Sequence, residues 1–578
     1  MERRASFSPL ALAAAAWVLL VAARALTLAP DFWEWDEILF VRAVLHGIDL
    51  RAGRPHAPGY PLFVESARGL AALGFAPFRA AVLVGFAGGV LAPAGLAALL
   101  AAFELPLAAS VLGGALYAFL PAVWLHGGRP LSDSPAAAAF LFSAAALVAA
   151  LRREDGRLLA AGAALAALDF GLRPQTAVAI LPLAAVVAFR FLRRGRVRPV
   201  LTALALGLGL SALAYAPAIR GSGGWAPFRD RVAAQAAYVR ESDSLSRADL
   251  ARAETWTRWF RDPFGPDALA IAFGVLAFAA LAFSFRKALA LVALFLPLYA
   301  LTIPYSSLQA APRYAVVLLP LPAALAALAL SRLRSVARIP AALLGAGLVG
   351  ASAAVAMPAV VEVARNPSPP VAAFAALKSD PLLAGRPLVL WTGLAMHREE
   401  LLPGARAREI GEDKTASVTR EELIVMSDDA IFGQKPVRHF AFESPLLLRI
   451  SRARYLNVSI VEGDPGLGVL RPWLDGKGDF DWTTGDANLV EGDLLTVRGV
   501  AGPVDVTVGA VASARAEARL RVTTNGPSRN LSLRSRERGT LAFRAFPDAQ
   551  GVLFRLRVAE GDVALANFRF TPAPGGAP

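Results

Sequence analysis

The sequence predicts a polytopic α-helical membrane protein with about eleven transmembrane helices and an external C-terminal domain that ends in a β-sandwich. Three observations support this fold class. The 578-residue chain is 56% hydrophobic, with a mean hydropathy of +0.50, which exceeds the apolar share of soluble domains. Long apolar runs recur as far as Val361. Beyond Leu446, apolar and polar residues alternate as they do in β-strands.

The charge and cysteine content exclude several classes of function. The formal net charge is +14, but the arginines fall mostly between apolar runs, which is typical of membrane topology. We therefore expect the lipid bilayer, and no nucleic acid, as a partner. The chain has no cysteine and only 5 histidines, which excludes disulfides and thiolate metal sites and argues against a histidine metal cluster.

The first apolar run, Leu10–Leu28, is long enough to remain in the membrane as a helix. Arg3 and Arg4 precede it, which favours a cytoplasmic N-terminus. Ten further runs are expected to span the membrane, several of them nearer 17 than 20 residues: Ala80–Phe103, Leu105–Leu125, Pro135–Leu151, Leu158–Leu172, Pro174–Leu192, Pro199–Ala218, Ala268–Phe285, Ala288–Ile303, Tyr314–Leu330 and Pro340–Val361.

The loops between these runs agree on one orientation. If the runs alternate across the membrane, four basic loops lie on the same side as the N-terminus. Their residues are Arg152, Arg153 and Arg157; Arg193, Arg194, Arg196 and Arg198; Arg286 and Lys287; and Arg332, Arg334 and Arg338. An odd number of spans then places the C-terminal region outside.

Residues 1–361 are therefore expected to form the membrane module, with external loops at 31–79 and 219–265. In the first loop, Asp31 follows Pro30 and is expected to cap a short helix, Phe32–His46, which Gly47 ends. A second surface helix is expected at Pro61–Leu73, because Glu65 and Arg68 make it too charged to span.

The C-terminal region divides into two predicted parts. Residues 362–445 are expected to be mixed α/β, with a helix at Pro370–Leu377 and a strand at Leu388–Thr392. Residues 446–578 are expected to form the β-sandwich, because strand-like segments recur between turn residues. These segments are LLTVRGV, VDVTVGAV, ARLRVTT, LAFRAF, VLFRLRVA and VALANFRF.

The first external loop carries four carboxylates within seven residues, at Asp31, Glu34, Asp36 and Glu37. Asp36 and Glu37 are the candidate catalytic residues, because a partly buried carboxylate can take a proton from a hydroxyl nucleophile. The alternative is a solvated acidic loop. For Asp31 and Glu34 we favour a helix-capping role.

The segment HAPGYP, from His56 to Pro61, contains two prolines around a glycine and predicts a tight turn. His56 and Tyr60 in it are candidate substrate contacts. Equally, the turn could only redirect the chain into the second surface helix.

Three arginines interrupt span ends on the external side, against the charge trend of the loops. They are Arg129, Arg173 and Arg313. Asp133 lies four residues after Arg129, and Tyr314 directly follows Arg313. These five residues are candidate substrate-binding residues, because guanidinium groups hold phosphate in a bidentate fork and stabilise a phosphate leaving group. Alternatively, the arginines reach lipid headgroups or pair with Asp133 and Asp169.

The segments WDEILFVRAV, HAPGYPLF and RYAVVLLPLP together resemble the GT-C superfamily of integral-membrane glycosyltransferases. The chain is most similar to the bacterial branch related to protein O-mannosyltransferases and aminoarabinose transferases, over Leu10 to Val361. The resemblance matches Asp36 to the residue that activates the acceptor, and Arg313 with Tyr314 to an Arg-Tyr pair near a late span. Ala57 departs from the family, which has proline there, and this puts the geometry of the turn in doubt.

The resemblance implies a polyprenyl-phosphate sugar donor and transfer to a hydroxyl of a glycan, lipid or protein acceptor outside the bacterial cytoplasmic (inner) membrane. A divalent metal, Mg²⁺ or Mn²⁺, stays open as a cofactor, because some relatives use one. Two rival functions also stay open. A transporter or lipid flippase would need polar residues or broken helices at mid-membrane. A scaffold whose β-rich tail binds glycan would need only an anchor, and eleven spans exceed that need.

Overall fold

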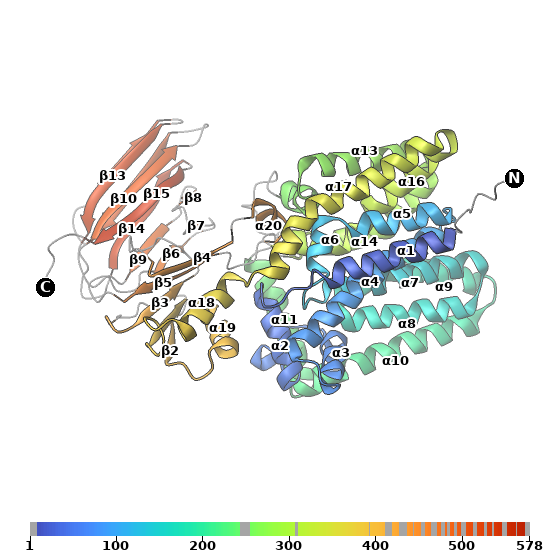
Figure 1. Ribbon diagram of the computed structural model, residues 1–578, viewed down its shortest axis with the longest axis horizontal. Helices are drawn as coiled ribbons and strands as arrows, with labels where there is room; N and C mark the ends of the chain where they lie inside the picture. The colour runs from blue at the N-terminus through green and yellow to red at the C-terminus, as the bar shows by residue number, and fades with distance from the viewer. Residues whose placement is uncertain are drawn as a thin grey trace. The chain divides into compact units, whose positions relative to one another are not determined.

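The computed structural model describes residues 9–242, 255–306, 310–391, 393–410, 419–426, 436–442, 444–451, 457–463 and, with short gaps, 471–572. The chain forms two compact units (Figure 1). The first comprises Met1–Asn366 and the short segment Glu443–Ala453, and the second comprises Pro367–Phe442 and Arg454–Pro578. Arg3, Arg4 and part of the predicted second external loop lie outside the described residues.

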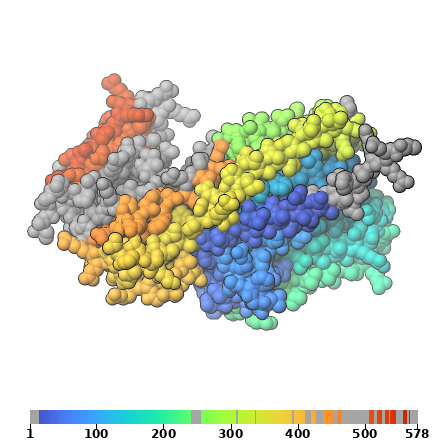
Figure 2. All heavy atoms as spheres, in the orientation of Figure 1, coloured from blue at the N-terminus to red at the C-terminus, as the bar shows by residue number. Residues whose placement is uncertain are grey.

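The first unit is helical. Its helices are α1 (Pro9–Ala25), α2 (Trp35–His46), α3 (Pro61–Ala72), α4 (Pro77–Ala102), α5 (Leu107–Ala118), α6 (Pro121–His126), α7 (Asp133–Arg153), α8 (Gly156–Leu172), α9 (Pro174–Arg193), α10 (Val197–Gly221), α11 (Trp225–Ser242), α13 (Asp267–Phe283), α14 (Phe285–Thr302), α15 (Ala311–Tyr314), α16 (Pro320–Val336), α17 (Arg338–Arg365) and α20 (Pro445–Ile450). Helices α1 and α17 lie on the face of this unit that Figure 2 presents.

The protein is a multi-pass membrane protein, but fewer helices qualify as spans than the eleven predicted. Among the described residues, six helices are long and apolar enough to cross a membrane, and two bent pairs raise the number to eight. Helices α1 and α8 have only 17 residues. The run at Leu105–Leu125 breaks into two short helices, because Pro121 cannot continue α5 and begins α6 instead.

The four basic loops meet at one end of the helical unit, as the sequence predicts. At that end, Arg152 donates to the carbonyl of Ala102 (3.0 Å) and Lys287 to that of Phe103 (2.8 Å), while Arg332 donates to Ser284 (2.8 Å). Helix α7 has 21 residues, or about 30 Å of length, which matches the hydrocarbon core of a bilayer. Its N-terminus therefore lies a membrane thickness away from the basic loops.

The opposite end of α7 is held by glycines of α4. A Cβ atom at Gly85 would lie 2.0 Å from the carbonyl oxygen of Arg129, and one at Gly88 would lie 2.2 Å from the nitrogen of Pro135. Only glycine allows this approach, so α4 fixes the backbone of the segment that carries Arg129 and Asp133.

The buried Arg24 fixes the break between α5 and α6. Its guanidinium donates to the carbonyl of Ala118 (2.6 Å), at the end of α5, and to that of Val123 (3.4 Å), which also accepts from the backbone N–H of Gly127. The segment that follows α6, and with it Arg129, is thereby tied to α1.

In the first external loop, the predicted capping role of Asp31 is wrong. Helix α2 begins at Trp35 with Glu34 as its N-cap, and it ends before Gly47 as predicted. Glu37 accepts hydrogen bonds from the backbone of Trp33 (2.5 Å) and Glu34 (3.1 Å), so it satisfies amide groups that Asp31 was expected to satisfy. Helix α3 lies where the second surface helix is predicted, and it ends one residue earlier, at Ala72.

The second unit combines a mixed α/β part with two antiparallel sheets. The first sheet has the order β2-β1-β3-β5-β4, in which β1 pairs in parallel with β2 and β3. Its elements are α18 (Pro369–Ser379), β1 (Leu388–Trp391), α19 (Leu394–Leu401), β2 (Ala407–Ile410), β3 (Leu423–Met426), β4 (Arg438–Ala441) and β5 (Asn457–Glu462). This sheet extends past the predicted boundary at residue 446.

The other two sheets have the orders β13-β10-β15-β8-β7 and β12-β11-β14-β9-β6. All six predicted strand segments are strands. The bounds are β6 (Arg471–Asp475), β7 (Phe480–Asp481), β8 (Asp486–Leu489), β9 (Leu494–Arg498), β10 (Val504–Ala512), β11 (Ala518–Thr524), β12 (Arg529–Leu533), β13 (Arg538–Ala545), β14 (Val552–Glu560) and β15 (Val563–Pro572). Alternate residues such as Val506, Val508, Leu520 and Val522 are buried, as in a β-sandwich.

Candidate functional site

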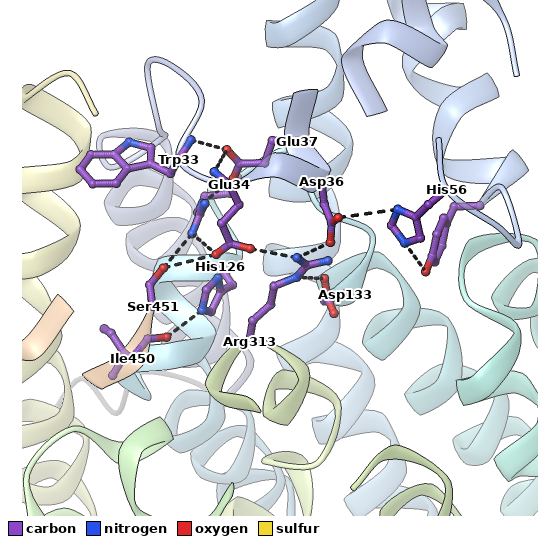
Figure 3. Close-up of polar contacts among 12 residues, drawn as sticks. Trp33, Glu34, Asp36, Glu37, His56, His126, Asp133, Arg313, Ile450 and Ser451 are labelled. Atoms are coloured by element: carbon purple, nitrogen blue, oxygen red, sulfur yellow. Dashed lines mark hydrogen bonds and ion pairs between the residues drawn. The ribbon is translucent and has the colours of Figure 1, made fainter. Parts of the chain in front are cut away.

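A network of charged side chains lies at the end of the helical unit opposite the basic loops (Figure 3). Four carboxylates and three guanidinium groups take part, and four separate segments of the chain supply them. All nine residues that the sequence singles out lie in it or against it: Asp36, Glu37, His56, Tyr60, Arg129, Asp133, Arg173, Arg313 and Tyr314.

Arg313, in α15, is the centre of the network. It donates from Nη1 to Oδ2 of Asp36 (2.6 Å) and Oε2 of Glu34 (2.9 Å), and from Nε to Oδ2 of Asp133 (3.1 Å). Asp133 continues the network to Arg173, since its Oδ1 lies 2.6 Å from Nη1 of that residue. One guanidinium thus brings together carboxylates from α2 and α7.

A second pair of charges lies deeper. Nε of Arg129 donates to Oε1 of Glu37 (2.6 Å), and Nη1 donates to Oε1 of Glu34 (2.9 Å). The Glu37 side chain is 0% exposed and that of Arg129 is 2% exposed. Because Glu37 also caps α2, this pair holds the acidic turn in place, and the Glu37 carboxylate is closed off from solvent.

Asp36 is on the accessible edge of the network, with 22% of its side chain exposed. Burial opposes its ionisation, but the charge of Arg313 and a hydrogen bond from it outweigh burial, so the pKa of Asp36 lies below its ordinary value. Asp36 is therefore a carboxylate at neutral pH, with Arg313 restraining its basicity.

His56 and Tyr60 continue outward from Asp36. Nδ1 of His56 lies 3.6 Å from Oδ1 of Asp36, and Nε2 lies 3.2 Å from the hydroxyl of Tyr60. Burial lowers the pKa of His56, which keeps the ring neutral at pH 7. The three side chains form a row that leads from Asp36 through His56 to the hydroxyl of Tyr60.

The aromatic rings of two tyrosines contact the guanidinium groups of the network. The guanidinium carbons of Arg173 and Arg313 lie 5.0 and 5.1 Å from the ring centre of Tyr314, and that of Arg173 lies 6.0 Å from the ring centre of Tyr60. Such rings hold the guanidinium planes without competing for their N–H groups. The N–H groups stay available to oxygen acceptors.

Sequence reasoning missed three contributors. Glu34 is the N-cap of α2, as predicted, but its side chain also bridges Arg129 and Arg313. Burial opposes the ionisation of Glu34, and these two charges outweigh it and lower the pKa of Glu34 to about 2. Ser451 and His126 carried no signal at all. Ser451 contacts Glu34 and Arg129, and Nε2 of His126 lies 3.0 Å from the carbonyl oxygen of Ile450.

The network does not fit a divalent metal. Among the described residues, no group of three or more histidine, aspartate or glutamate side chains is placed to hold a metal ion. The carboxylates that lie close together already share guanidinium groups, so a metal ion would have to displace an arginine to reach them.

Comparisons with known proteins were made for the sequence and the structure. No protein-family model matches the chain, and no curated protein matches it. The structure is similar to that of arabinosyltransferase EmbB from Mycobacterium smegmatis, with a TM-score of 0.42 and 14% identity over 98% of this chain and 65% of EmbB.

Two further solved structures are similar at low identity. ArnT from Cupriavidus metallidurans bound to undecaprenyl phosphate has a TM-score of 0.43 and 16% identity over 70% of this chain and 86% of ArnT. Arabinofuranosyltransferase AftD from Mycobacteria has a TM-score of 0.37 and 13% identity over 98% of this chain and 61% of AftD. This chain thus covers less than two thirds of EmbB and of AftD. The similarity to these three structures extends over 70% to 98% of this chain, at identities of 13% to 16%.

Proposed function

We propose that the protein is a membrane glycosyltransferase that moves a sugar from a polyprenyl-phosphate donor to a hydroxyl acceptor. The observation that carries this proposal is the contact between Asp36, a partly exposed carboxylate, and Arg313, 2.6 Å away. A proton acceptor and a phosphate-binding group side by side at one end of an apolar helical bundle are what such a transfer requires.

The proposed orientation places this end outside the cytoplasm. Basic loops favour the cytoplasmic side of a membrane, and the network lies at the opposite end of α7 from those loops. In a bacterial cell the transfer would then take place on the outer face of the cytoplasmic membrane, where the donor reaches Arg313 from the lipid.

In the proposed reaction, Asp36 accepts the proton of the acceptor hydroxyl as its oxygen forms a bond to the anomeric carbon of the sugar. The bond between that carbon and the phosphate oxygen breaks, and its electron pair leaves with the polyprenyl phosphate. Arg313 and Arg173 stabilise the phosphate charge. His56 then takes the proton from Asp36, because its neutral ring lies 3.6 Å away.

Contact with the donor also makes Asp36 a better base. In the structure Arg313 lowers the basicity of Asp36. A phosphate that shares the Arg313 guanidinium weakens this contact, and the pKa of Asp36 rises toward its ordinary value. The donor therefore prepares the base that activates the acceptor.

The test is transfer by the purified protein in vesicles that contain undecaprenyl-phosphate sugars, with release of undecaprenyl phosphate as the readout. Asp36→Asn should abolish release while the protein still folds. Glu65→Gln is the matched control, since Glu65 lies in the same external loop and pairs with Arg68, which is not part of the network. Full release by Asp36→Asn, or movement of lipid across the vesicle without any covalent product, would overturn the proposal.

A further inference from the structure

A short segment of the C-terminal half of the chain is built into the helical unit. Residues 443–453 belong to the first unit, although the residues immediately before and after them belong to the second. The segment contains α20, Pro445–Ile450, and ends at Ser451. Its last two residues reach the charged network (Figure 3).

Ile450 and Ser451 make three polar contacts with the network. Nε2 of His126 donates to the carbonyl oxygen of Ile450 (3.0 Å). The hydroxyl of Ser451 accepts from Nη1 of Arg129 (3.2 Å) and donates to Oε1 of Glu34 (3.3 Å). Ser451 and Ile450 are both buried, so solvent does not replace these contacts.

Other residues of the segment anchor it on the same unit. Nη2 of Arg449 lies 3.0 Å from Oδ1 of Asp267, at the start of α13. Leu446 packs against Gly265, where a Cβ atom would lie 2.7 Å from the leucine side chain. The segment is therefore held at both ends of α20, and Ser451 has a fixed place.

We propose that Ser451 is a positioning residue for the site, which sets how Glu34 divides its carboxylate between two arginines. The inference rests on the proposed function, because it assigns Arg313 to a phosphate. Ser451 and Arg129 together hold Oε1 of Glu34, which leaves only Oε2 for Arg313.

Without the Ser451 hydroxyl, Arg129 alone holds Oε1 of Glu34, and the less restrained carboxylate can turn further toward Arg313. A carboxylate that engages a guanidinium with two oxygens occupies the fork that a phosphate would use. The serine thus keeps part of Arg313 available to the donor, although it lies 417 residues from Glu34 in the sequence.

The first test is binding of undecaprenyl phosphate to the full-length protein in detergent. Ser451→Ala should weaken binding about tenfold, the effect of one hydrogen bond to a charged group, and Ser451→Thr should restore it because the hydroxyl returns. The melting temperature should stay within about 2 °C of wild type in both variants. The control is Ser379→Ala, on the exposed face of α18. Unchanged affinity in Ser451→Ala, or no recovery in Ser451→Thr, would overturn the positioning role.

The second test does not depend on any substrate. The chain has no native cysteine, so single cysteines report accessibility directly. Ser451→Cys should react slowly with a maleimide, Ser379→Cys should react rapidly, and adding His126→Ala to Ser451→Cys should speed its labelling. If wild type fails to bind undecaprenyl phosphate, the proposed function fails. Rapid labelling of Ser451→Cys in the otherwise unchanged chain would instead refute the placement of the segment.

Discussion

Stability in mild acid depends on His126, at the end of α6. The ring is buried, and Nε2 is fixed on the carbonyl oxygen of Ile450. Three charged groups act on it, namely Glu34, Arg129 and Arg313. Burial outweighs the attraction of Glu34 and lowers the pKa of His126 to about 4. Its ordinary value, which applies to the unfolded chain, is about 6.5.

The sign follows from proton binding. Between these two values the unfolded chain binds the proton and the folded chain does not, so the folded state loses stability as pH falls below about 6.5. Between pH 8 and pH 5 the loss amounts to about 2 kcal/mol. At roughly 2 °C per kcal/mol, this lowers the melting temperature by about 4 °C.

Melting of the purified protein in detergent at pH 8 and pH 5 measures this term. His126→Asn removes the titrating group and keeps an N–H donor near Ile450. Between pH 8 and pH 5 the melting temperature of this variant should therefore fall by about 4 °C less than that of wild type. His46→Asn, on the exposed end of α2, is the control and should behave as wild type. Equal falls in wild type and His126→Asn would refute the reasoning.

Two further changes test the construction of the site. Arg313→Lys keeps the charge but replaces a guanidinium that contacts three carboxylates. We expect undecaprenyl phosphate binding to fall by at least tenfold, because lost charge-assisted hydrogen bonds cost about 1.5–3 kcal/mol each. Unchanged binding would show that Arg313 does not hold the phosphate. Gly85→Ala places a Cβ 2.0 Å from the Arg129 carbonyl oxygen and should reduce the yield of folded protein in size-exclusion chromatography. The control is Gly274→Ala, which has nothing within 4 Å of its Cβ and should leave the yield unchanged. Equal yields of the two variants would contradict the close approach of α4.

The convergence of Asp36 and Arg313 could be predicted because each restriction on it is visible in the sequence. Both residues interrupt or follow apolar runs, and alternating those runs puts both at the same end of the bundle. The strands of the sandwich were equally visible, since period-two alternation with turn residues marks each of them. The strand signal is local, and the topology signal needs only a count of the spans.

The remaining parts of the site depend on contacts that no local pattern records. Glu34 is the N-cap of α2, and this role alone accounts for an acidic residue at that position. Nothing near Glu34 in the sequence indicates that it also bridges two arginines. Ser451 meets it across 417 residues, and nothing around Ser451 marks it. The break at Pro121 is not visible for a similar reason, because an apolar run does not tell whether a proline begins a new helix in the middle of it.

Two ion pairs on one turn of α2 differ in what they can do. Glu37 and Arg129 are sealed and hold backbone amides, whereas Asp36 keeps 22% of its side chain exposed beside Arg313. A buried pair that loses one partner costs several kcal/mol, so the sealed pair cannot exchange its contacts during a reaction. Asp36 can exchange them, because solvent or substrate replaces Arg313 at its open side. The adjacent carboxylates therefore differ in what they are free to do: Glu37 fixes the turn, and Asp36 has the open side that the proposed base needs.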